Sequence, residues 1–277
     1  MRNIKRAELI NTILEEARNK GQLPWQSPWF IVRKQNASGH VYTGINRFML
    51  SFQDDVIYMT FNQVKKLGGY VLKGQHGHQV IFYDIKVVDV IDDENNEVKS
   101  KKFPLLKVYY VFGLSQVWLP DDVKDAILLK KNLEQRNVNY NLLDVVKSIV
   151  SNVEVLPSDK AYYSPMKDRI VLPQSFNNEA GFVNTLLHEL IHATGHESRL
   201  NRFDKISRPA EELVAEIGSV LLASELGLEY EHNNTVAYVQ SWLQVLEESK
   251  DELPKIIKCA EQAVDYVMSE ISKVKAA

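Results

Sequence analysis

Hydrophobic residues recur at helical spacing near the start of the chain and through most of its second half. Apolar residues three and four positions apart predict a helix over residues 4–20, which ends before Gly21. The same spacing predicts further helices over residues 140–151, 179–194, 209–226, 233–248 and 253–274. A strand at 153–156 and a hairpin over 161–172 add a small sheet, so the second half is predicted to be mostly helical.

The first half instead carries short runs of aromatic and β-branched residues that are typical of strands. A short helix over residues 61–68 is stopped by a Gly-Gly pair. Strands are predicted at residues 70–72, 80–83, 85–91 and 105–113. The Gly-rich segment 73–78 is expected to join the first two strands, and the charged segment 92–97 is expected to form a hairpin loop.

Two interruptions in these patterns suggest how the chain is organised. Pro24 and Pro28 fix an extended or turning path and exclude a helix at this point. Residues 121–135 are charged and lack a clean period, so they are predicted to be a linker. We therefore expect an α+β protein in which an N-terminal antiparallel-sheet domain, residues 1–125, precedes a mostly helical domain, residues 136–277.

The composition is that of an ordinary globular protein and excludes several classes. Of the 277 residues, 45% are hydrophobic and 25% are charged, and no run of 18 apolar residues is present to span a membrane. The basic N-terminus leads into an amphipathic helix instead of an apolar signal core, so we expect a cytoplasmic protein. The single cysteine, Cys259, excludes an intramolecular disulfide and leaves His and carboxylate groups as the ligands of any metal ion.

The charge is distributed unevenly along the chain. Residues 1–90 hold 12 Lys and Arg against 7 Asp and Glu, a balance of +5, so the remainder carries −8 of a net charge of −3. A basic half joined to an acidic half is typical of a module that faces nucleic acid beside a module with another role. Chance variation of the surface is the alternative interpretation.

One short motif carries most of the candidate chemistry. His188 and His192 are four residues apart in a predicted helix, so both imidazoles lie on one face and can bind one ion. Glu189 is next to the first histidine, where it can act as a general base on a water molecule. A buried helix with two histidines and a glutamate needs a reason, because buried polar groups are costly unless they are paired. The motif indicates a metal site of the zinc-peptidase type.

A third ligand is expected outside this motif, because a catalytic zinc ion takes three protein ligands and leaves one position open. Glu212, 20 residues after His192, is the favoured ligand, and Glu216, on the same face of the next helix, is the favoured hydrogen-bond partner of a ligating histidine. These two roles could be exchanged. His196 is the competing ligand, although its place after the helix end also suits the capping of carbonyl groups. Glu211 lies about 100° around the helix and is predicted to face solvent.

The segment before the metal motif provides candidates for substrate binding. The hairpin at 161–172 offers an edge strand with which an extended peptide could pair. Tyr162 and Tyr163 are candidates for oxyanion stabilisation, and plain packing in the sheet is the alternative for each. Two imidazoles and a carboxylate suit one divalent metal ion, for which we expect Zn²⁺, while Mn²⁺ and Co²⁺ are chemically admissible.

Aromatic and basic residues are interleaved in the first half of the chain. Such a pattern is typical of single-stranded nucleic-acid binding, in which bases stack on rings while cations track the phosphates. The candidates are Trp25, Trp29, Arg33, Lys34, Tyr42, Arg47, Lys65 and Lys66, together with Phe48, Phe52, Tyr58 and Phe61. A core rich in aromatic residues is the alternative explanation of the same pattern.

Many short segments, in the same order along both halves, give this sequence a resemblance to the ArdC-like antirestriction proteins of plasmids and other mobile elements. The matching segments are Leu23-Pro24-Trp25 to Trp29, 42–46, 60–63 to Gly68-Gly69, Lys73-Gly74, 163–165, 168–170, Pro173, 188–196 with Arg199-Leu200, and 211–216. As a set they are far more specific than the metal motif alone. The segment after Trp118 is the weakest part of the resemblance.

The resemblance implies an N-terminal domain that binds single-stranded DNA and a C-terminal zincin-like metallopeptidase domain. It also implies a role in protecting incoming DNA from host restriction. Asn46 and Lys73 lie in matching segments and join the candidate DNA-binding residues. Similar N-terminal domains occur in primase-type proteins of conjugative plasmids, so the first half alone does not fix the biological role.

Several functions agree with these features. The first is an antirestriction-type protein that binds single-stranded DNA and hydrolyses a protein substrate at a zinc-dependent site. The second is a non-catalytic protein that binds and protects single-stranded DNA, or a primase-associated DNA-transfer protein, with a structural or vestigial metal site. The third is a toxin or a regulator-cleaving protease of a mobile element. No membrane partner is expected, and the sequence does not indicate an oligomeric state.

Overall fold

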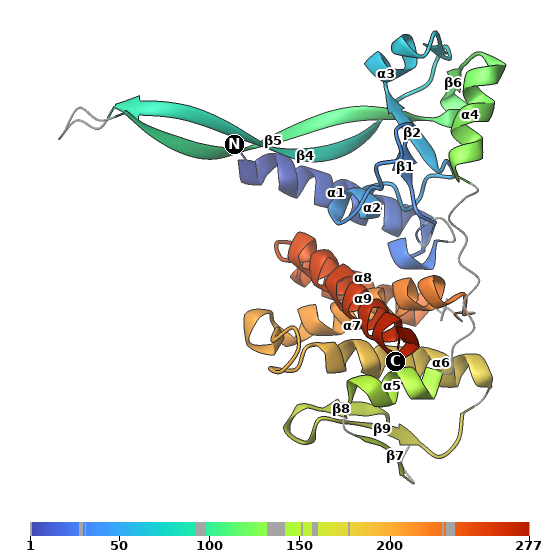
Figure 1. The fold of residues 1–277 in the computed structure, drawn as a ribbon, viewed down its shortest axis with the longest axis vertical. Helices are drawn as coiled ribbons and strands as arrows, with labels where there is room; N and C mark the ends of the chain where they lie inside the picture. Colours follow the sequence, from blue (N-terminus) through green and yellow to red (C-terminus); the bar gives the residue numbers. More distant parts are fainter. Residues whose placement is uncertain are drawn as a thin grey trace. The chain divides into compact units, whose positions relative to one another are not determined.

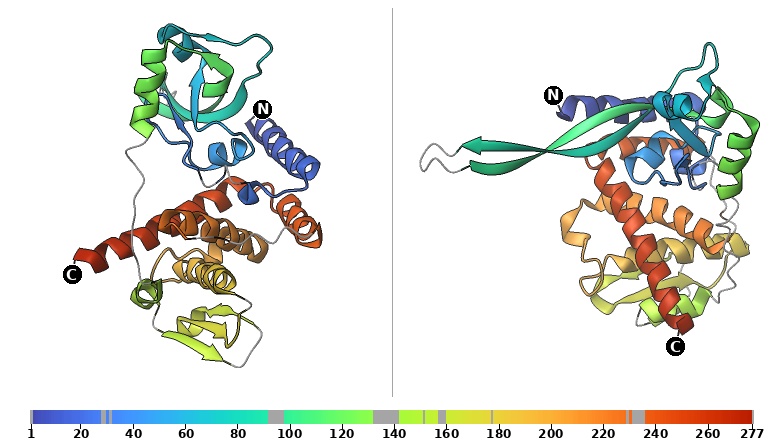
Figure 2. Two further views of the ribbon diagram at one scale, coloured as in Figure 1. Left: turned by 90° about the vertical axis from the view of Figure 1, so that its right-hand side faces the viewer. Right: turned by 45° about the horizontal axis from the view of Figure 1, so that its top comes forward.

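The chain folds into two compact units whose elements are shown in Figures 1 and 2. The structure is a computed structural model and describes residues 2–27, 30, 32–91, 98–131, 142–150, 152–156, 160–176, 178–228, 230 and 236–276. Unit 1 comprises residues 1–6 and 33–134, and unit 2 comprises residues 7–32 and 135–277. No described helix combines the length and the apolar character that a membrane span requires.

Residues 7–32 pack with unit 2, whereas the sequence-based boundary at 125 puts them in the first domain. Helix α1 (Arg2–Lys20) buries an apolar face, and the indole of Trp25 meets that of Trp242 edge-on with 6.0 Å between ring centroids. A single 3-10 turn, Pro24–Gln26, follows α1 and has proline at its first position, where the missing N–H costs nothing. The prolines therefore exclude an α-helix here but allow this short turn.

The main sheet of unit 1 has the strand order β1-β2-β5-β4. Its strands are β1 (Gln35–Asn36), β2 (Ile57–Thr60), β4 (His78–Ile91) and β5 (Val98–Gly113). β1 runs parallel to β2, and the other pairs are antiparallel. β4 and β5 pair without interruption from His78↔Val111 to Ile91↔Val98, and Figure 1 shows them as a long twisted ribbon. The two strands predicted within 80–91 are therefore one, and the predicted hairpin loop at 92–97 lies outside the described residues.

A second, two-stranded sheet in unit 1 corrects one predicted connection. β3 (Tyr70–Val71) pairs with β6 (Val117–Trp118), not with β4. The segment 73–78 is therefore no hairpin turn within one sheet. The reason is packing, because Val71 and Val117 join one apolar cluster with the β2 residues Ile57 and Met59.

Besides the start of α1, the described part of unit 1 contains the α-helices α2 (Ile45–Met49), α3 (Phe61–Lys66) and α4 (Asp121–Lys131). α3 begins at Thr60, whose hydroxyl accepts a hydrogen bond from the backbone N–H of Gln63. α4 occupies most of the predicted linker. Its first turn carries Asp121 and Asp122, which suit the positive end of a helix dipole, and its Ile127 is buried.

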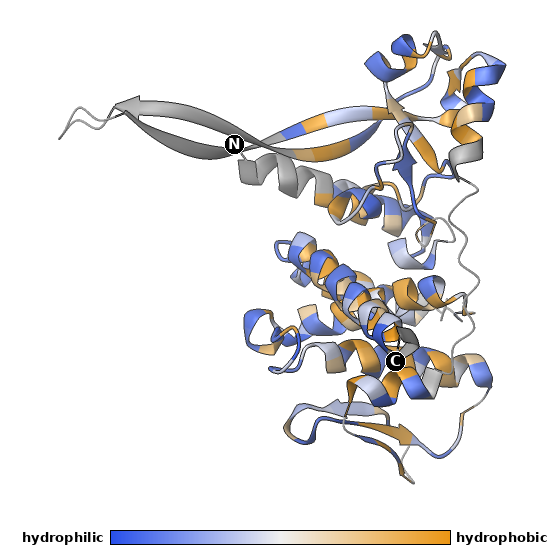
Figure 3. Cartoon of the chain, viewed as in Figure 1, coloured by the Kyte–Doolittle hydropathy of each residue, from blue (hydrophilic) through white to orange (hydrophobic). Residues whose placement is uncertain are grey.

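Unit 2 contains a small sheet and a set of long helices. The sheet has the order β7-β9-β8, with β7 (Asn152–Leu156), β8 (Tyr162–Ser164) and β9 (Arg169–Pro173). β9 is parallel to β7 and antiparallel to β8, so β8 is an edge strand. The helices are α5 (Leu142–Ile149), α6 (Glu179–Thr194), α7 (Arg208–Leu226), α8 (Val236–Glu248) and α9 (Leu253–Ala276), and Figure 3 shows the mixed apolar and polar faces of α6 to α9.

Helices α6 and α7 approach each other closely, and this contact positions the metal motif. Gly218 of α7 faces Ile191 of α6, and a Cβ atom at this glycine would lie 2.9 Å from the isoleucine Cγ2 atom. α6 begins at Asn178 and α7 at Ser207, and each side chain accepts a hydrogen bond from a backbone N–H of the first turn. α7 ends at Gly227, which has a positive φ of 66°.

We expect Gly218→Val to destabilise unit 2 by about 1–3 kcal/mol, because the added carbons overpack the contact with Ile191. Gly218→Ala adds one carbon and should cost less. Thermal unfolding of the two variants beside the unaltered protein measures the difference. A valine variant as stable as the unaltered protein would show that the two helices are free to separate here.

Candidate metal centre

Three side chains from two helices converge on one point in unit 2. His188 and His192 project from the same face of α6, with 4.8 Å between their ring centroids. Glu212 of α7 faces both rings, and its Oε2 atom lies 3.6 Å from Nε2 of the first and 3.5 Å from Nε2 of the second. One ligand atom from each of the three residues lies within 4.8 Å of the others. Two imidazole nitrogens and a carboxylate at this spacing fit one divalent metal ion.

The far nitrogens of the two histidines face two other glutamates. Nδ1 of His188 lies 3.7 Å from Oε2 of Glu216, and Nδ1 of His192 lies 3.1 Å from Oε1 of Glu211. The 3.1 Å contact is a hydrogen bond that orients the ring of His192, and the longer contact places a carboxylate beside Nδ1 of His188. Nε2 of each ring is left facing Glu212. The geometry favours Glu212 as the third ligand and Glu216 as the partner of a ligating histidine.

Glu211 is buried, so the prediction that it faces solvent is wrong. Its side chain is 9% exposed and accepts two hydrogen bonds of 2.7 Å from Arg202, whose side chain is 4% exposed. A buried carboxylate is tolerated because a buried guanidinium neutralises it in a two-pronged contact. Nothing local in the sequence marks this pairing, since Arg202 precedes α7 in an irregular segment.

The charges of the ligands are coupled to one another. Burial lowers the pKa of His192, but hydrogen bonds to Glu211 and Glu212 outweigh this effect and raise the pKa to about 9. Hydrogen bonds from His188 and His192 hold the pKa of the Glu212 carboxyl below its usual range. The proton on the imidazole thus balances the carboxylates, and binding of a metal ion would release it.

Glu189, the candidate general base, lies next to His188 and is held by contacts with its surroundings. It is buried, and burial raises the pKa of its carboxyl while the neighbouring His188 and His192 oppose this shift. Its carboxylate also has a hydrogen bond to the backbone of Tyr163 on strand β8. The edge strand therefore helps to orient the carboxylate.

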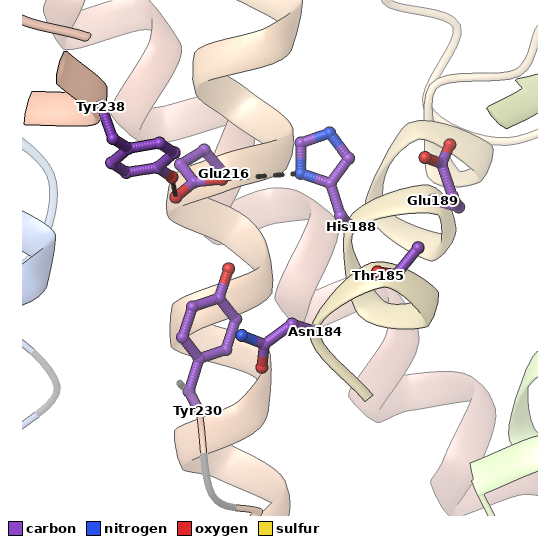
Figure 4. A pocket seen from close by; sticks show the side chains of 7 residues that line it. All are labelled: Asn184, Thr185, His188, Glu189, Glu216, Tyr230 and Tyr238. Atoms are coloured by element: carbon purple, nitrogen blue, oxygen red, sulfur yellow. Dashed lines mark hydrogen bonds and ion pairs between the residues drawn. The ribbon is translucent and has the colours of Figure 1, made fainter. Parts of the chain in front are cut away.

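A pocket of about 250 Å³ opens beside this carboxylate (Figure 4). Its lining comprises Asn184, Thr185, His188, Glu189, Glu216, Tyr230 and Tyr238. The hydroxyl of Tyr238 donates to Oε1 of Glu216, so α8 is linked through Glu216 to His188. The hydroxyl of Tyr230 lies 3.0 Å from Oγ of Ser219. No local signal points to either tyrosine, because both follow the metal motif by more than 35 residues.

The predicted oxyanion role of Tyr163 does not agree with its contacts. Its hydroxyl donates to Asp168 at 2.6 Å and accepts from Arg199 at 2.8 Å, and the side chain is buried. The phenol therefore belongs to a structural cluster that ties the β8–β9 turn to the segment after α6. Tyr162 is exposed and does not line the pocket in Figure 4, so its substrate role stays a prediction.

His196 belongs to the turn that follows α6, and not to the group of three ligands. Its Nδ1 atom accepts a hydrogen bond from the backbone N–H of Ser198 and lies 2.8 Å from the hydroxyl of the same serine. This local contact is of the kind that closes a helix end. His196 is not among the three side chains whose ligand atoms converge. Because its ring nitrogen accepts a backbone N–H, the ring does not cap a carbonyl group through this nitrogen either.

Several candidate DNA-binding residues are core residues instead. Trp25 is 0% exposed and Tyr42 is 3% exposed, so neither ring is available to an incoming base. Lys34 is buried and donates to the carbonyl oxygens of Gln53 and Asp55, and burial lowers its pKa to about 8, with Asp55 opposing this shift. This lysine thus holds backbone carbonyls and does not track phosphates.

The other candidates divide into structural and exposed residues. Asn46 exchanges two hydrogen bonds of 2.7 Å with the backbone of Ile81, which fixes α2 on strand β4. Arg47 is half-buried, and Trp29 lies outside the described residues. The exposed cations are Arg33, Lys65, Lys66 and Lys73, which stay candidates for DNA binding.

Fold and site together define a domain of the zincin class, with two histidines on one helix and a glutamate on the next. Residues 144–262 match the family described as zincin-like metallopeptidase, and residues 4–112 match the N-terminal domain of anti-restriction factor ArdC. The crystal structure of the antirestriction ArdC protein from plasmid R388, in its metal-free form, is 30% identical and has a TM-score of 0.74. It matches over 97% of this chain and 98% of its own. This chain belongs to the ArdC family of antirestriction proteins.

Other relatives extend the comparison. The Mn(II)-bound structure of the same R388 protein has a TM-score of 0.71 and 30% identity over 96% of this chain and 97% of its own. Two proteins named DNA primase TraC from Escherichia coli are 29% and 28% identical over 95% of this chain. The chain spans only 20% and 27% of their lengths. The uncharacterized protein y4eC of Sinorhizobium fredii is 25% identical over 96% of this chain and 92% of its own.

We expect Glu211→Gln to weaken the binding of a divalent metal ion by about 10- to 100-fold, because an amide neither neutralises Arg202 nor attracts the Nδ1 proton of His192. Calorimetric titration with Zn²⁺ and with Mn²⁺ measures the affinity. Glu197→Gln, in the exposed turn after α6, is the matched control and should bind like the unaltered protein. Equal affinities for the two variants would contradict a role of Glu211 in orienting the histidine.

Proposed function

We propose that this chain is a metal-dependent peptidase that binds single-stranded DNA and acts in DNA transfer by a mobile element. The observation that carries the peptidase proposal is the convergence of His188, His192 and Glu212 beside the buried carboxylate of Glu189. Zn²⁺ is the expected ion, and the Mn(II)-bound form of the R388 relative supports manganese as an admissible one.

Each residue around the site has a separate role in the proposed hydrolysis of a peptide. When bound, the metal ion supplies Lewis-acid polarisation of a peptide carbonyl and of a water molecule. Glu189 takes the proton from the attacking water and delivers it to the leaving amine. Glu216 and Glu211 hold the imidazoles in one orientation. The edge strand β8, which orients Glu189 through its backbone, is the place where an extended substrate would pair.

Glu189→Gln should retain the metal ion and lose about 10²- to 10⁴-fold in the rate of peptide cleavage, because an amide cannot accept the proton. Metal content by mass spectrometry and hydrolysis of unfolded casein by the metal-loaded protein measure the two properties. Glu197→Gln serves again as the matched control. If the Glu189 variant cleaves casein as fast as the control, this carboxylate is not the general base.

A non-catalytic role is the alternative, and the same variant distinguishes it. In this case the protein protects entering single strands and the metal ion is structural. Plasmid transfer into restricting and non-restricting recipient cells is compared for the unaltered protein and for Glu189→Gln. Protection that disappears with the variant supports a peptidase function, whereas protection that persists supports the binding role.

The proposal of single-stranded DNA binding is supported by the ArdC N-terminal family and by the matches to two primases. The charge of unit 1 agrees with it. Residues 56–83 contain no Asp or Glu, and the exposed Lys65, Lys66 and Lys73 lie within this segment. A cationic, acid-free stretch of this kind attracts a phosphate backbone.

Replacing Lys65 and Lys66 by Gln should reduce the slope of log affinity against log salt by about 1.4, because each phosphate contact on a single strand contributes about 0.7. Fluorescence anisotropy with oligo-dT at several salt concentrations measures this slope. Lys147→Gln, an exposed lysine of unit 2, is the control. An unchanged slope in the double variant would exclude both lysines from the phosphate path.

A further inference from the structure

The short ribbon of β3 and β6 exposes two aromatic rings on one face. Its register pairs Tyr70 with Trp118 and Val71 with Val117. Because side chains alternate across a strand, the two valines point one way, into the core of unit 1, and the two rings point the other way. The outer face of this ribbon is thus purely aromatic.

The two rings form a preassembled stack that is open to solvent. Their centroids are 5.2 Å apart, and the ring planes differ by only 17°. Tyr70 is 56% exposed and Trp118 is 46% exposed, which is unusual for large aromatic side chains that have an apolar core next to them. The stack presents a flat surface to which a further ring can add.

The surroundings of this stack are held by close packing and hydrogen bonds. Gly69 lies so close to the Trp118 carbonyl oxygen that a Cβ atom there would be 2.3 Å from it. The backbone N–H of Leu72 donates to the carbonyl of Gln116, which extends the pairing of the ribbon, and the Gln116 amide donates to the carbonyl of His76. A rigid support lowers the entropy that is lost when a ligand binds.

The charge around the stack identifies the kind of ligand. Tyr70 lies in the acid-free segment 56–83, four residues after Lys66 and three before Lys73, and both lysines are exposed. On the other strand, β6 is soon followed by Asp121 and Asp122 at the start of α4. The segment that carries Tyr70 is therefore cationic on both sides of the ring, with Lys66 in α3 and Lys73 after β3, whereas the segment after Trp118 is acidic. We expect an anionic ligand to follow the first of these segments.

We propose that Tyr70 and Trp118 form the stacking platform for an unpaired base of single-stranded DNA, with the adjoining phosphates near Lys66 and Lys73. This inference rests on the proposed binding of single-stranded DNA and names the place where it occurs. Such a platform would favour a single strand over a duplex, since the bases of a duplex are already stacked and their faces are not accessible. Every base has a stacking face, so the platform selects no sequence.

The test measures the affinity of the full chain for oligo-dT by anisotropy at one salt concentration. Trp118→Ala and Tyr70→Ala should each weaken binding roughly 5- to 150-fold, the loss that corresponds to about 1–3 kcal/mol for one stacked base. Trp118→Phe keeps a ring in place and should recover most of the affinity. Tyr109→Ala removes another exposed ring of unit 1, which contacts Phe82 edge-on, and should have no effect.

The outcomes separate this inference from the function on which it rests. In one outcome the unaltered protein binds oligo-dT, and the two alanine variants bind it equally well and have unchanged thermal midpoints. This result would overturn the proposed platform but leave the proposed DNA binding intact. If the unaltered protein does not bind oligo-dT at low salt, the proposed DNA binding itself fails. Equal weakening by Tyr109→Ala would indicate a diffuse aromatic surface, of the kind used for a protein partner, and would also overturn the platform.

Discussion

The geometry of the metal centre depends on one buried ion pair, that of Arg202 with Glu211. The guanidinium also donates to the hydroxyl of Thr194 at 2.7 Å, so one side chain holds both the end of α6 and the first turn of α7. His192 lies in the first of these turns, and Glu212 directly follows the second. Removal of one partner would leave the other charge buried, which typically costs about 3–5 kcal/mol. The relative position of the two helices therefore depends on this ion pair as well as on the apolar contact of Gly218 with Ile191.

Much of this arrangement could be predicted from the sequence, because an amphipathic helix leaves a periodic pattern of apolar residues within a short segment. Periodic apolar residues located α6 to α9 closely. Helical spacing placed Glu212 and Glu216 on one face but left their roles exchangeable, and only the structure shows which of them lies near both histidines. The partners of the site could not be predicted in the same way. Arg202 lies in an irregular segment and Tyr238 on another helix, so each reaches the site only through the tertiary fold.

In the first half of the chain, the sequence pattern predicted the exposed residues poorly. Interleaved aromatic and basic residues suggested a binding surface, but the pattern does not say which rings are exposed. Trp25, Tyr42 and Lys34 are buried, whereas the open stack joins Tyr70 to Trp118 across 48 positions of sequence. Strands of two residues are too short for any periodicity, so only the pairing register brings these rings together.

The packing of residues 7–32 with unit 2 limits which segments of the gene can be exchanged by recombination. α1 buries Ile13 and Leu14 there, and Arg18 forms an ion pair of 2.6 Å with Glu247 of α8. A gene fragment that encoded only the second half would lack this covering helix and would leave Trp242 without its partner ring. Recombination at the midpoint of the gene would thus separate parts of one folding unit. The two halves are expected to travel between mobile elements as a single cassette.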